Sequence, residues 1–330
     1  MTQARTGNVE GSGAGAAVKP RKPLGSAPLL VVGSVALDDV ETVRDRRKEV
    51  LGGAASYFSA AASFFAPVRL VGVVGSDFPR VHEEFLGGFG VDLLGLERTD
   101  GRTFRWAGRY SADFNNRTTL DTQLNVFETF HPKLPAAWSD SPFVFLANIH
   151  PALQFDVLEQ VRKPRFVACD TMNFWIDGQR PDLERVLSRV DMLLLNDEEA
   201  RLLSRHDNLP SAARAIRTLG PKAVVVKRGD AGALLFYEGG VFAAPAFPIE
   251  AVVDPTGAGD SFAGGFMGWL AHTGDVTPAG IRTALIIGSV LASFCCEDFS
   301  LDRYRTLELS AIRERFAAFA DLVQFDKIRL

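Results

Sequence analysis

The sequence contains few cysteines and no excess of positive charge. The three cysteines are Cys169, Cys295 and Cys296. An odd number with an adjacent pair is not a disulfide framework, so we predict that the protein works in the reducing cytoplasm. Lysine and arginine together number 36, and aspartate and glutamate 40, which gives a formal net charge of −4. This balance argues against the broad basic face that binding to nucleic acid requires.

The chain also lacks a long apolar run. The nearest candidate, residues 284–296, is interrupted by Gly288 and two serines, and it is shorter than the about 18 residues that a membrane helix needs. We therefore expect a buried helix there and no membrane association. Residues 1–27 contain almost no large apolar side chains, which predicts a disordered N-terminal tail ahead of one folded domain at 28–330.

Short apolar runs alternate with amphipathic helical patterns across most of this domain. Runs that are apolar on both faces and separated by helices are typical of a parallel sheet covered on both sides. We therefore predict an α/β fold with a mostly parallel central sheet, followed by helices alone after about Asp254. The predicted strands are Leu29–Val32, Val68–Val74, Phe143–Ile149, Phe166–Ala168, Met192–Leu195, Ala223–Val226 and Ala233–Tyr237.

One segment, residues 102–127, has a different pattern. Two runs rich in β-branched and aromatic residues, 103–110 and 117–124, flank a centre that contains Asn115 and Asn116. Asparagine pairs favour tight turns, and the flanking residues favour strands. We predict an antiparallel hairpin that stands apart from the main sheet as a small lid.

Polar residues follow nearly every predicted strand. In open α/β sheets, ligands bind beyond the carboxyl ends of the strands. Asp38 follows the first run and Asp170 follows Phe166–Ala168, while Asn196 and Glu199 follow Met192–Leu195. Each could be a simple helix cap, but their shared position predicts a binding site at this edge of the sheet.

The strongest motif is Asp-Pro-Thr-Gly-Ala-Gly-Asp at positions 254–260. Glycine at 257 and 259 lets the backbone turn tightly, and a helix is expected to begin near Gly259. The unpaired N–H groups at such a start bind anions, and Asp260 lies in the first turn beside them. This carboxylate either stabilises the helix start or accepts a proton from a hydroxyl.

These residues closely resemble the C-terminal signature of the ribokinase-like, or PfkB, family of carbohydrate and nucleoside kinases. The resemblance spans about residues 29–312, because other landmarks follow in the family's order. They are a first strand leading to Asp38, the pair Gly52-Gly53, a Gly-x-Asp turn at 75–77, Asn-x-x-Glu at 196–199, and Lys227 before Gly-x-x-Gly at 229–232. The resemblance implies a ribokinase-like three-layer α/β/α sandwich with a β-hairpin lid.

The resemblance also implies a reaction, the ATP-dependent transfer of the γ-phosphoryl group to an alcohol of a sugar or nucleoside. Asp260 is then the catalytic base, and the backbone of Gly257, Ala258 and Gly259 forms the anion hole. Asp38, Gly52, Gly53, Tyr57 and Asp254 bind the substrate. Asn196, Glu199, Lys227, Gly229 and Gly232, with Gly257 and Gly259, bind ATP, and Asn196 and Glu199 hold Mg2+ through water.

Two departures from the family leave the substrate open. Tyr57 stands where many sugar kinases have asparagine, and it either stacks on the substrate or packs at a helix start. Residues 289–300 lack the glycine of the monovalent-cation loop, so potassium activation is not predicted. Tyr57 and the lid aromatic residues favour a nucleoside.

The lid leaves a further alternative. Arg105, Arg109 and Arg117 either grip a sugar phosphate or are exposed strand charges that discourage aggregation. By analogy with the family, the lid hairpins also join a homodimer. A non-catalytic sensor of sugars or nucleosides on the same fold is the alternative function, although a sensor needs neither Asp260 nor the glycine loop.

Overall fold

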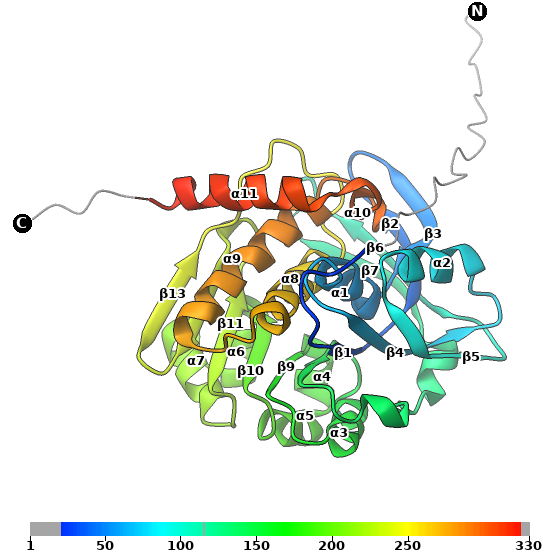
Figure 1. Ribbon diagram of the computed structural model, residues 1–330, viewed down its shortest axis with the longest axis horizontal. Helices are drawn as coiled ribbons and strands as arrows, with labels where there is room; N and C mark the ends of the chain where they lie inside the picture. The colour runs from blue at the N-terminus through cyan, green and yellow to red at the C-terminus, as the bar shows by residue number, and fades with distance from the viewer. Residues whose placement is uncertain (1–20, 115, 325–330) are drawn as a thin grey trace, which may run out of the picture.

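The computed structural model describes residues 21–114 and 116–324. In this part of the chain a nine-stranded sheet forms the centre of the molecule (Figure 1). Its seven strands from β11 to β5 run parallel, and β12 and β13 extend it antiparallel at one edge. In order across the sheet the strands are β13 (Gly240–Ala244), β12 (Ala233–Tyr237), β11 (Ala223–Lys227), β10 (Met192–Asn196), β9 (Phe166–Asp170), β8 (Phe143–Leu146), β1 (Leu29–Val32), β4 (Val68–Gly75) and β5 (Asp92–Thr99).

Helices cover both faces of this sheet. One layer comprises α1 (Ala54–Ala62), α2 (Arg80–Gly88), α8 (Ala258–Thr273), α9 (Pro278–Cys295), α10 (Asp302–Thr306) and α11 (Leu309–Leu322). The other comprises α3 (Pro151–Gln160), α4 (Asn173–Gly178), α5 (Arg180–Leu187), α6 (Asp197–Ser204) and α7 (Leu209–Arg217). In β1, Leu29 and Val31 pack into the first layer, whereas Leu30 and Val32 pack into the second. The predicted three-layer α/β/α sandwich is confirmed.

All seven strands predicted for this sheet are present, with ends shifted by at most three residues. The sequence interpretation missed β5 and β13, which lie at the two edges of the sheet. Edge strands carry a less continuous apolar pattern, as the mostly exposed or half-buried β5 illustrates. The helical pattern predicted after Asp254 is confirmed by α8 to α11.

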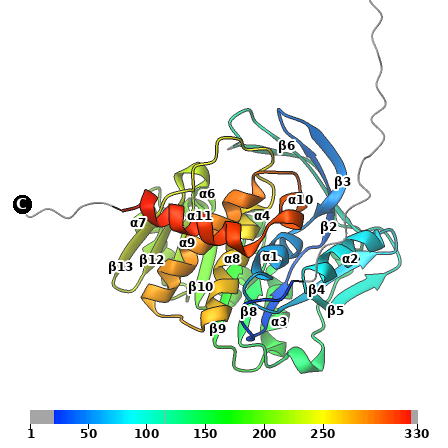
Figure 2. The ribbon, with the colours of Figure 1, turned by 45° about the horizontal axis from the view of Figure 1, so that its top comes forward.

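The lid is larger than predicted. The expected hairpin is present as β6 (Phe104–Tyr110) and β7 (Arg117–Gln123), which pair antiparallel. It belongs to a four-stranded sheet in the order β3–β2–β6–β7, with β2 (Ala36–Glu41) and β3 (Arg46–Gly52). The second view shows these strands projecting from the sandwich beside α1 and α2 (Figure 2). The lid is thus built from two segments of the chain, and the earlier one carries Asp38.

Part of the segment predicted as a tail packs against the folded domain. Residues 1–20 lie outside the described part, but Arg21 is anchored on the domain. Its guanidinium donates to Ala60 O at 3.1 Å, Ser63 Oγ at 3.0 Å and Tyr304 O at 2.6 Å. It also lies 3.6 Å from the centre of the Phe64 ring. Residues 21–27 therefore belong to the folded domain.

The apolar segment near the C-terminus forms α9, as expected. Of the described helices, α9 meets the length and composition of a membrane span, and 61% of that stretch is buried inside the protein. Its contacts are with α8 and with the core beneath it. It serves as a core helix of the sandwich.

Candidate active site

The N-terminus of α8 forms the floor of the candidate site. Gly257 precedes the helix with φ 74°, a left-handed conformation that glycine adopts without strain. No side chain caps this helix start. The amide of Ala258 donates to Pro255 O at 3.1 Å, so one of the three N–H groups predicted to hold an anion is already engaged. Within the described residues, no backbone acceptor is recorded for the Gly257 and Gly259 amides.

The Tyr57 ring packs against the loop at Gly257. Its side chain is 1% exposed. A Cβ added at Gly257 would lie 2.2 Å from Cγ of the Tyr57 ring, so the loop fits only because residue 257 has no side chain. Of the two interpretations left open by the sequence, this burial favours packing at a helix start over stacking on a substrate.

Asp260 lies in the first turn of α8 and is held partly protonated at neutral pH. Burial, and next the charge of Asp170, raise the pKa of Asp260 to about 7, while Lys227 and Arg117 oppose this rise. A carboxyl group with a pKa near the working pH is well suited to accept and release protons. The environment of Asp260 thus brings its pKa into the neutral range.

A buried ion pair lies beside this turn. Lys227, at the end of β11, places Nζ 2.9 Å from Oδ2 of Asp170, which ends β9. Their side chains are 19% and 7% exposed. Nζ would lie 3.2 Å from a Cβ on Gly259. Burial opposes the charge on Lys227, but Asp170 and Glu199 outweigh it and raise the pKa of the ammonium. A permanent positive charge thus adjoins the anion-binding helix start.

Gln154 fixes the strand end that carries Asp170. This α3 side chain is 1% exposed. Its amide nitrogen donates to Leu146 O at 3.2 Å, Ala147 O at 2.9 Å and Asp170 O at 3.0 Å. It therefore ties the carboxyl ends of β8 and β9 together. The sequence interpretation placed Asp170 after a strand but did not find its ion pair or Gln154, because neither contact leaves a local pattern.

Asn196 and Glu199 form a reciprocal cap at the start of α6. Glu199 N donates to Asn196 Oδ1 at 2.7 Å, and Asn196 N donates to Glu199 Oε2 at 2.8 Å. Burial, and next the charge of Asp170, raise the pKa of Glu199 to about 7. Among the described residues no group of three or more His, Cys, Asp or Glu is arranged to hold a metal ion.

Asp38 and the two glycines form a second polar surface near the first. Asp38 is 4% exposed and its Oδ1 has no hydrogen-bond partner among the described residues. Burial, with Asp254 and Asp260 nearby, raises the pKa of Asp38 to about 8. A Cβ on Gly52 would lie 1.9 Å from Asp38 Oδ2. Gly53 has φ 91°. A buried acid with an unpartnered oxygen is suited to bind a hydroxyl group.

Asp254, which the sequence predicts to bind substrate, is hydrogen-bonded to two backbone amides. It is fully buried. Its Oδ1 accepts from Thr256 N at 2.8 Å and its Oδ2 from Ser300 N at 3.4 Å. Burial raises the pKa of this carboxyl group, and these hydrogen bonds oppose the rise. Asp254 thus fastens the loop before α8.

The predicted nucleotide loop lies between β11 and β12. Gly229 begins a short 3-10 turn, η3 (Gly229–Ala231), with φ 55°, and Gly232 follows with φ 81°. A Cβ on Gly232 would lie 2.1 Å from Ala244 O, so this glycine is required by the close approach of β13. The loop begins at the end of the strand that carries Lys227.

The lid contacts the α8 loop through one tyrosine. Tyr110 of β6 is 8% exposed, and its hydroxyl is 3.2 Å from Thr256 Oγ1. Arg105 pairs with Glu49 and Asp77.

The other two lid arginines have different environments. Arg109 pairs with Glu41, 2.9 Å between Nε and Oε1. Together with the pairs of Arg105, this contact supports the strand-charge interpretation for both residues. Arg117 instead lies over the Trp106 ring, 5.2 Å from its centre, and opposes the rise in the pKa of Asp260. Arg117 is thus the lid cation that acts on the candidate site.

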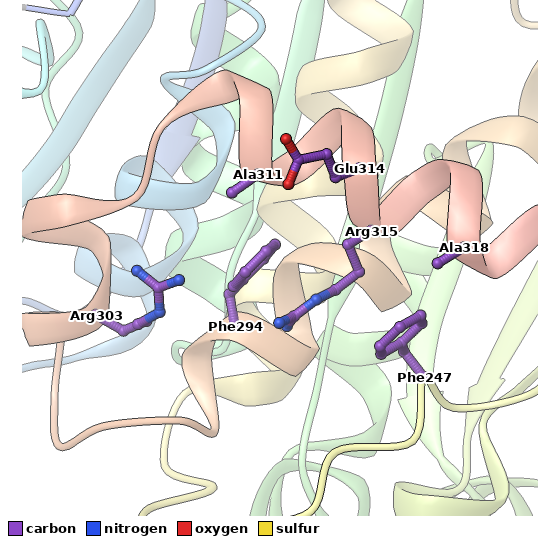
Figure 3. A pocket seen from close by; sticks show the side chains of 7 residues that line it. All are labelled: Phe247, Phe294, Arg303, Ala311, Glu314, Arg315 and Ala318. Carbon is purple, nitrogen blue, oxygen red and sulfur yellow. The ribbon is translucent and has the colours of Figure 1, made fainter.

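One hollow in the surface lies away from the candidate site. A cavity of about 360 Å3 is lined by residues of α9, α10, α11 and the segment before α8 (Figure 3). Arg315 extends between Phe294 and Phe247 there and donates to Ser293 Oγ at 3.0 Å. None of the lining residues belongs to the predicted site. The arginine serves to join α11 to α9.

Comparison with known proteins places this geometry in a family. Residues 28–303 match the pfkB family carbohydrate kinases. The chain belongs to the PfkB family.

Named relatives within this PfkB grouping include nucleoside kinases. The chain is 30% identical to a cytidine kinase of Thermococcus kodakarensis, over 72% of this chain and 87% of that protein. It is 28% identical to a nucleoside kinase of Methanothermobacter thermautotrophicus, over 82% and 89%. The solved Burkholderia thailandensis nucleoside kinase in complex with inosine superimposes with a TM-score of 0.72 at 20% identity, over 88% and 98%. This PfkB protein is a carbohydrate or nucleoside kinase with the ribokinase fold.

Proposed function

We propose that this PfkB protein is an ATP-dependent nucleoside kinase in which Asp260 is the catalytic base. The observation that carries the proposal is the position of Asp260. It lies on the first turn of an uncapped helix beside Lys227, in a setting that raises its pKa to about 7. Such a carboxylate accepts the proton of an attacking hydroxyl while the adjacent positive groups hold the charge of the phosphoryl group.

The residues around Asp260 fit a phosphoryl-transfer step. The Gly257 and Gly259 amides and the α8 dipole attract negative charge, and Lys227 adds a full positive charge beside them. Asp38 accepts a hydrogen bond from a second hydroxyl and so orients the substrate. Closure of the four-stranded lid excludes water, which limits hydrolysis of the donor nucleotide.

The same surface fits ATP and Mg2+. Phosphates are held by Lys227, by the α8 N-terminus and by the loop at Gly229 and Gly232, while Glu199 accepts from metal-bound water. Mg2+ held there would supply positive charge that offsets the charge of the phosphates. A Cβ at Gly232 would meet Ala244 O, and a Cβ at Gly259 would meet Lys227 Nζ. The phosphate-binding surface therefore requires residues without side chains at these two positions.

A nucleoside is favoured over a simple sugar as acceptor. Two of the named relatives, at 30% and 28% identity, act on cytidine or nucleosides. Arg105 and Arg109 are engaged with acidic lid residues, which weakens the case for a sugar phosphate. The sensor alternative has no observation in its favour, because both the base and the anion site are retained.

The test is ADP formation with Mg-ATP across nucleosides (cytidine, uridine, adenosine, inosine) and sugars (ribose, fructose). We expect turnover with at least one nucleoside, lost by two or more orders of magnitude in Asp260→Asn. Asp321→Asn, an exposed substitution on α11, is the matched control and retains activity. Turnover with sugars alone would overturn the nucleoside assignment. Saturable nucleoside binding without turnover would favour the sensor.

A further inference from the structure

An aromatic cluster stands at the carboxyl edge of the sheet, outside the residues assigned so far. Phe174 and Trp175 belong to α4, which follows β9, and His150 lies between β8 and α3. Phe174 is 64% exposed. The Trp175 ring centre lies 4.8 Å from that of Phe174 and 5.1 Å from that of His150, in edge-to-face arrangements. Phe174 is thus exposed and the other two rings are half-buried, so the cluster presents an aromatic surface at this edge.

The cluster is fixed to a polar side chain of the strand edge. The indole N–H of Trp175 donates to Oδ1 of Asn148 at 2.9 Å. The amide nitrogen of Asn148 lies 3.2 Å from the thioether sulfur of Met172, which is a weak acceptor. Trp175 therefore orients the Asn148 amide. A carbonyl or ring nitrogen of a ligand would be a stronger acceptor for its N–H than the Met172 sulfur.

Asn148 lies next to the candidate active site. In the β8–β9 pairing, Leu146 is opposite Cys169, so the residues after them, Asn148 and Asp170, leave neighbouring strands at the same edge. Gln154 ties these two strand ends together. Asp170 in turn pairs with Lys227 beside the α8 N-terminus. Adjacent strands are about 5 Å apart, so Asn148 is within reach of a ligand held beside Asp170.

We propose that Trp175, Phe174 and His150 form a stacking ledge for the nucleobase of the substrate, with Asn148 as its polar contact. This inference rests on the proposed nucleoside kinase function and names the residues that distinguish a nucleoside from a bare sugar. Aromatic rings bind the face of any base, whereas the Asn148 amide donates to a base carbonyl or ring nitrogen. The ledge thus recognises a base that presents an acceptor on its edge.

The test compares Trp175→Leu, Trp175→Phe and Phe174→Leu with wild type, using cytidine and inosine as substrates. We expect KM for the nucleoside to rise about 5- to 100-fold in Trp175→Leu. Trp175→Phe keeps a ring but loses the N–H that orients Asn148, so its loss is smaller. KM for Mg-ATP and the melting temperature stay within error, which a merely structural role would not allow. Phe155→Leu, an aromatic substitution on α3, is the matched control.

Binding gives a second readout. We expect nucleoside binding to quench tryptophan fluorescence in wild type and the quench to be lost or reduced in Trp175→Leu. Unchanged nucleoside KM and unchanged quenching in both Trp175 variants would overturn the ledge while leaving nucleoside kinase activity intact. A wild-type enzyme that turns over sugars but neither binds nor phosphorylates nucleosides would instead overturn the proposed function, and the ledge with it.

Discussion

The charges around Asp260 predict opposite effects of two neighbouring substitutions on the pH dependence of turnover. In the proposed mechanism Asp260 acts in its ionised form, and its pKa is raised to about 7, so kcat should fall about tenfold per pH unit below 7. Lys227 lowers this pKa and Asp170 raises it. Removing Lys227 must therefore move the acidic limb to higher pH, and removing the charge of Asp170 must move it to lower pH.

The size of the shift follows from the charge geometry. A charge within about 6 Å at an effective dielectric constant of about 20 changes the ionisation free energy by about 3 kcal/mol, or about 2 pKa units. In Lys227→Met the limb should then move from about 7 toward about 9. The activity lost at pH 7 should therefore return as the pH is raised. In Asp170→Asn it should move down by one to two units.

The assay is the pH profile of kcat between pH 5 and 9.5 for wild type, both variants and a control. Lys222→Met is the matched control, because Lys222 pairs with Asp191 at 2.7 Å on the surface and is 81% exposed. Its profile should coincide with wild type. If Lys227→Met lost activity equally at every pH, the lysine would hold phosphate without tuning Asp260. If both variants shifted the limb in the same direction, the electrostatic account would be refuted.

Three further substitutions test the surrounding structure. Gly52→Ala places a Cβ 1.9 Å from Asp38 Oδ2, so the nucleoside KM should rise at least tenfold with little change in the KM for Mg-ATP, and an unchanged nucleoside KM would contradict this. Tyr110→Phe removes the 3.2 Å hydrogen bond with Thr256. We expect transition-state stabilisation to fall by about 1 kcal/mol, measured as an about fivefold lower kcat/KM. Full activity would show that this lid contact does not contribute to catalysis. Arg21→Ala removes three partly buried hydrogen bonds and should lower the free energy of unfolding in urea by about 3 kcal/mol without altering kcat. A change below about 0.5 kcal/mol would show that the anchor is dispensable.

The central sheet could be predicted from the sequence because its strands are buried on both faces. Each then appears as a short continuous apolar run, as in Leu29–Val32, whose four residues are fully buried. The strands β2 and β3 escaped notice for the opposite reason. Arg46 to Glu49 of β3 are exposed and charged, so no apolar pattern marks them, and their pairing with the predicted hairpin is a long-range contact.

The candidate site was predictable where a motif fixes the local backbone, and less so where folding brings distant residues together. Asp260 and Gly257 lie in one short motif, and their positions at the start of α8 follow from it. The role of Tyr57 depends on contact with Gly257, 200 positions away in the chain, and the sequence could not choose between stacking and packing. The pair Asp170–Lys227 likewise spans 57 positions.

The most direct test of the account is a single-turnover measurement of phosphoryl transfer from γ-32P-labelled ATP to cytidine or the best nucleoside. Wild-type enzyme should transfer the label to a hydroxyl of the nucleoside. Asp260→Asn should slow this step by about 100- to 10,000-fold, with the Kd of nucleoside and Mg-ATP changed by less than about threefold. Transfer by Asp260→Asn at near the wild-type rate, or label appearing only as inorganic phosphate in the wild type, would contradict Asp260 as the base of a nucleoside kinase.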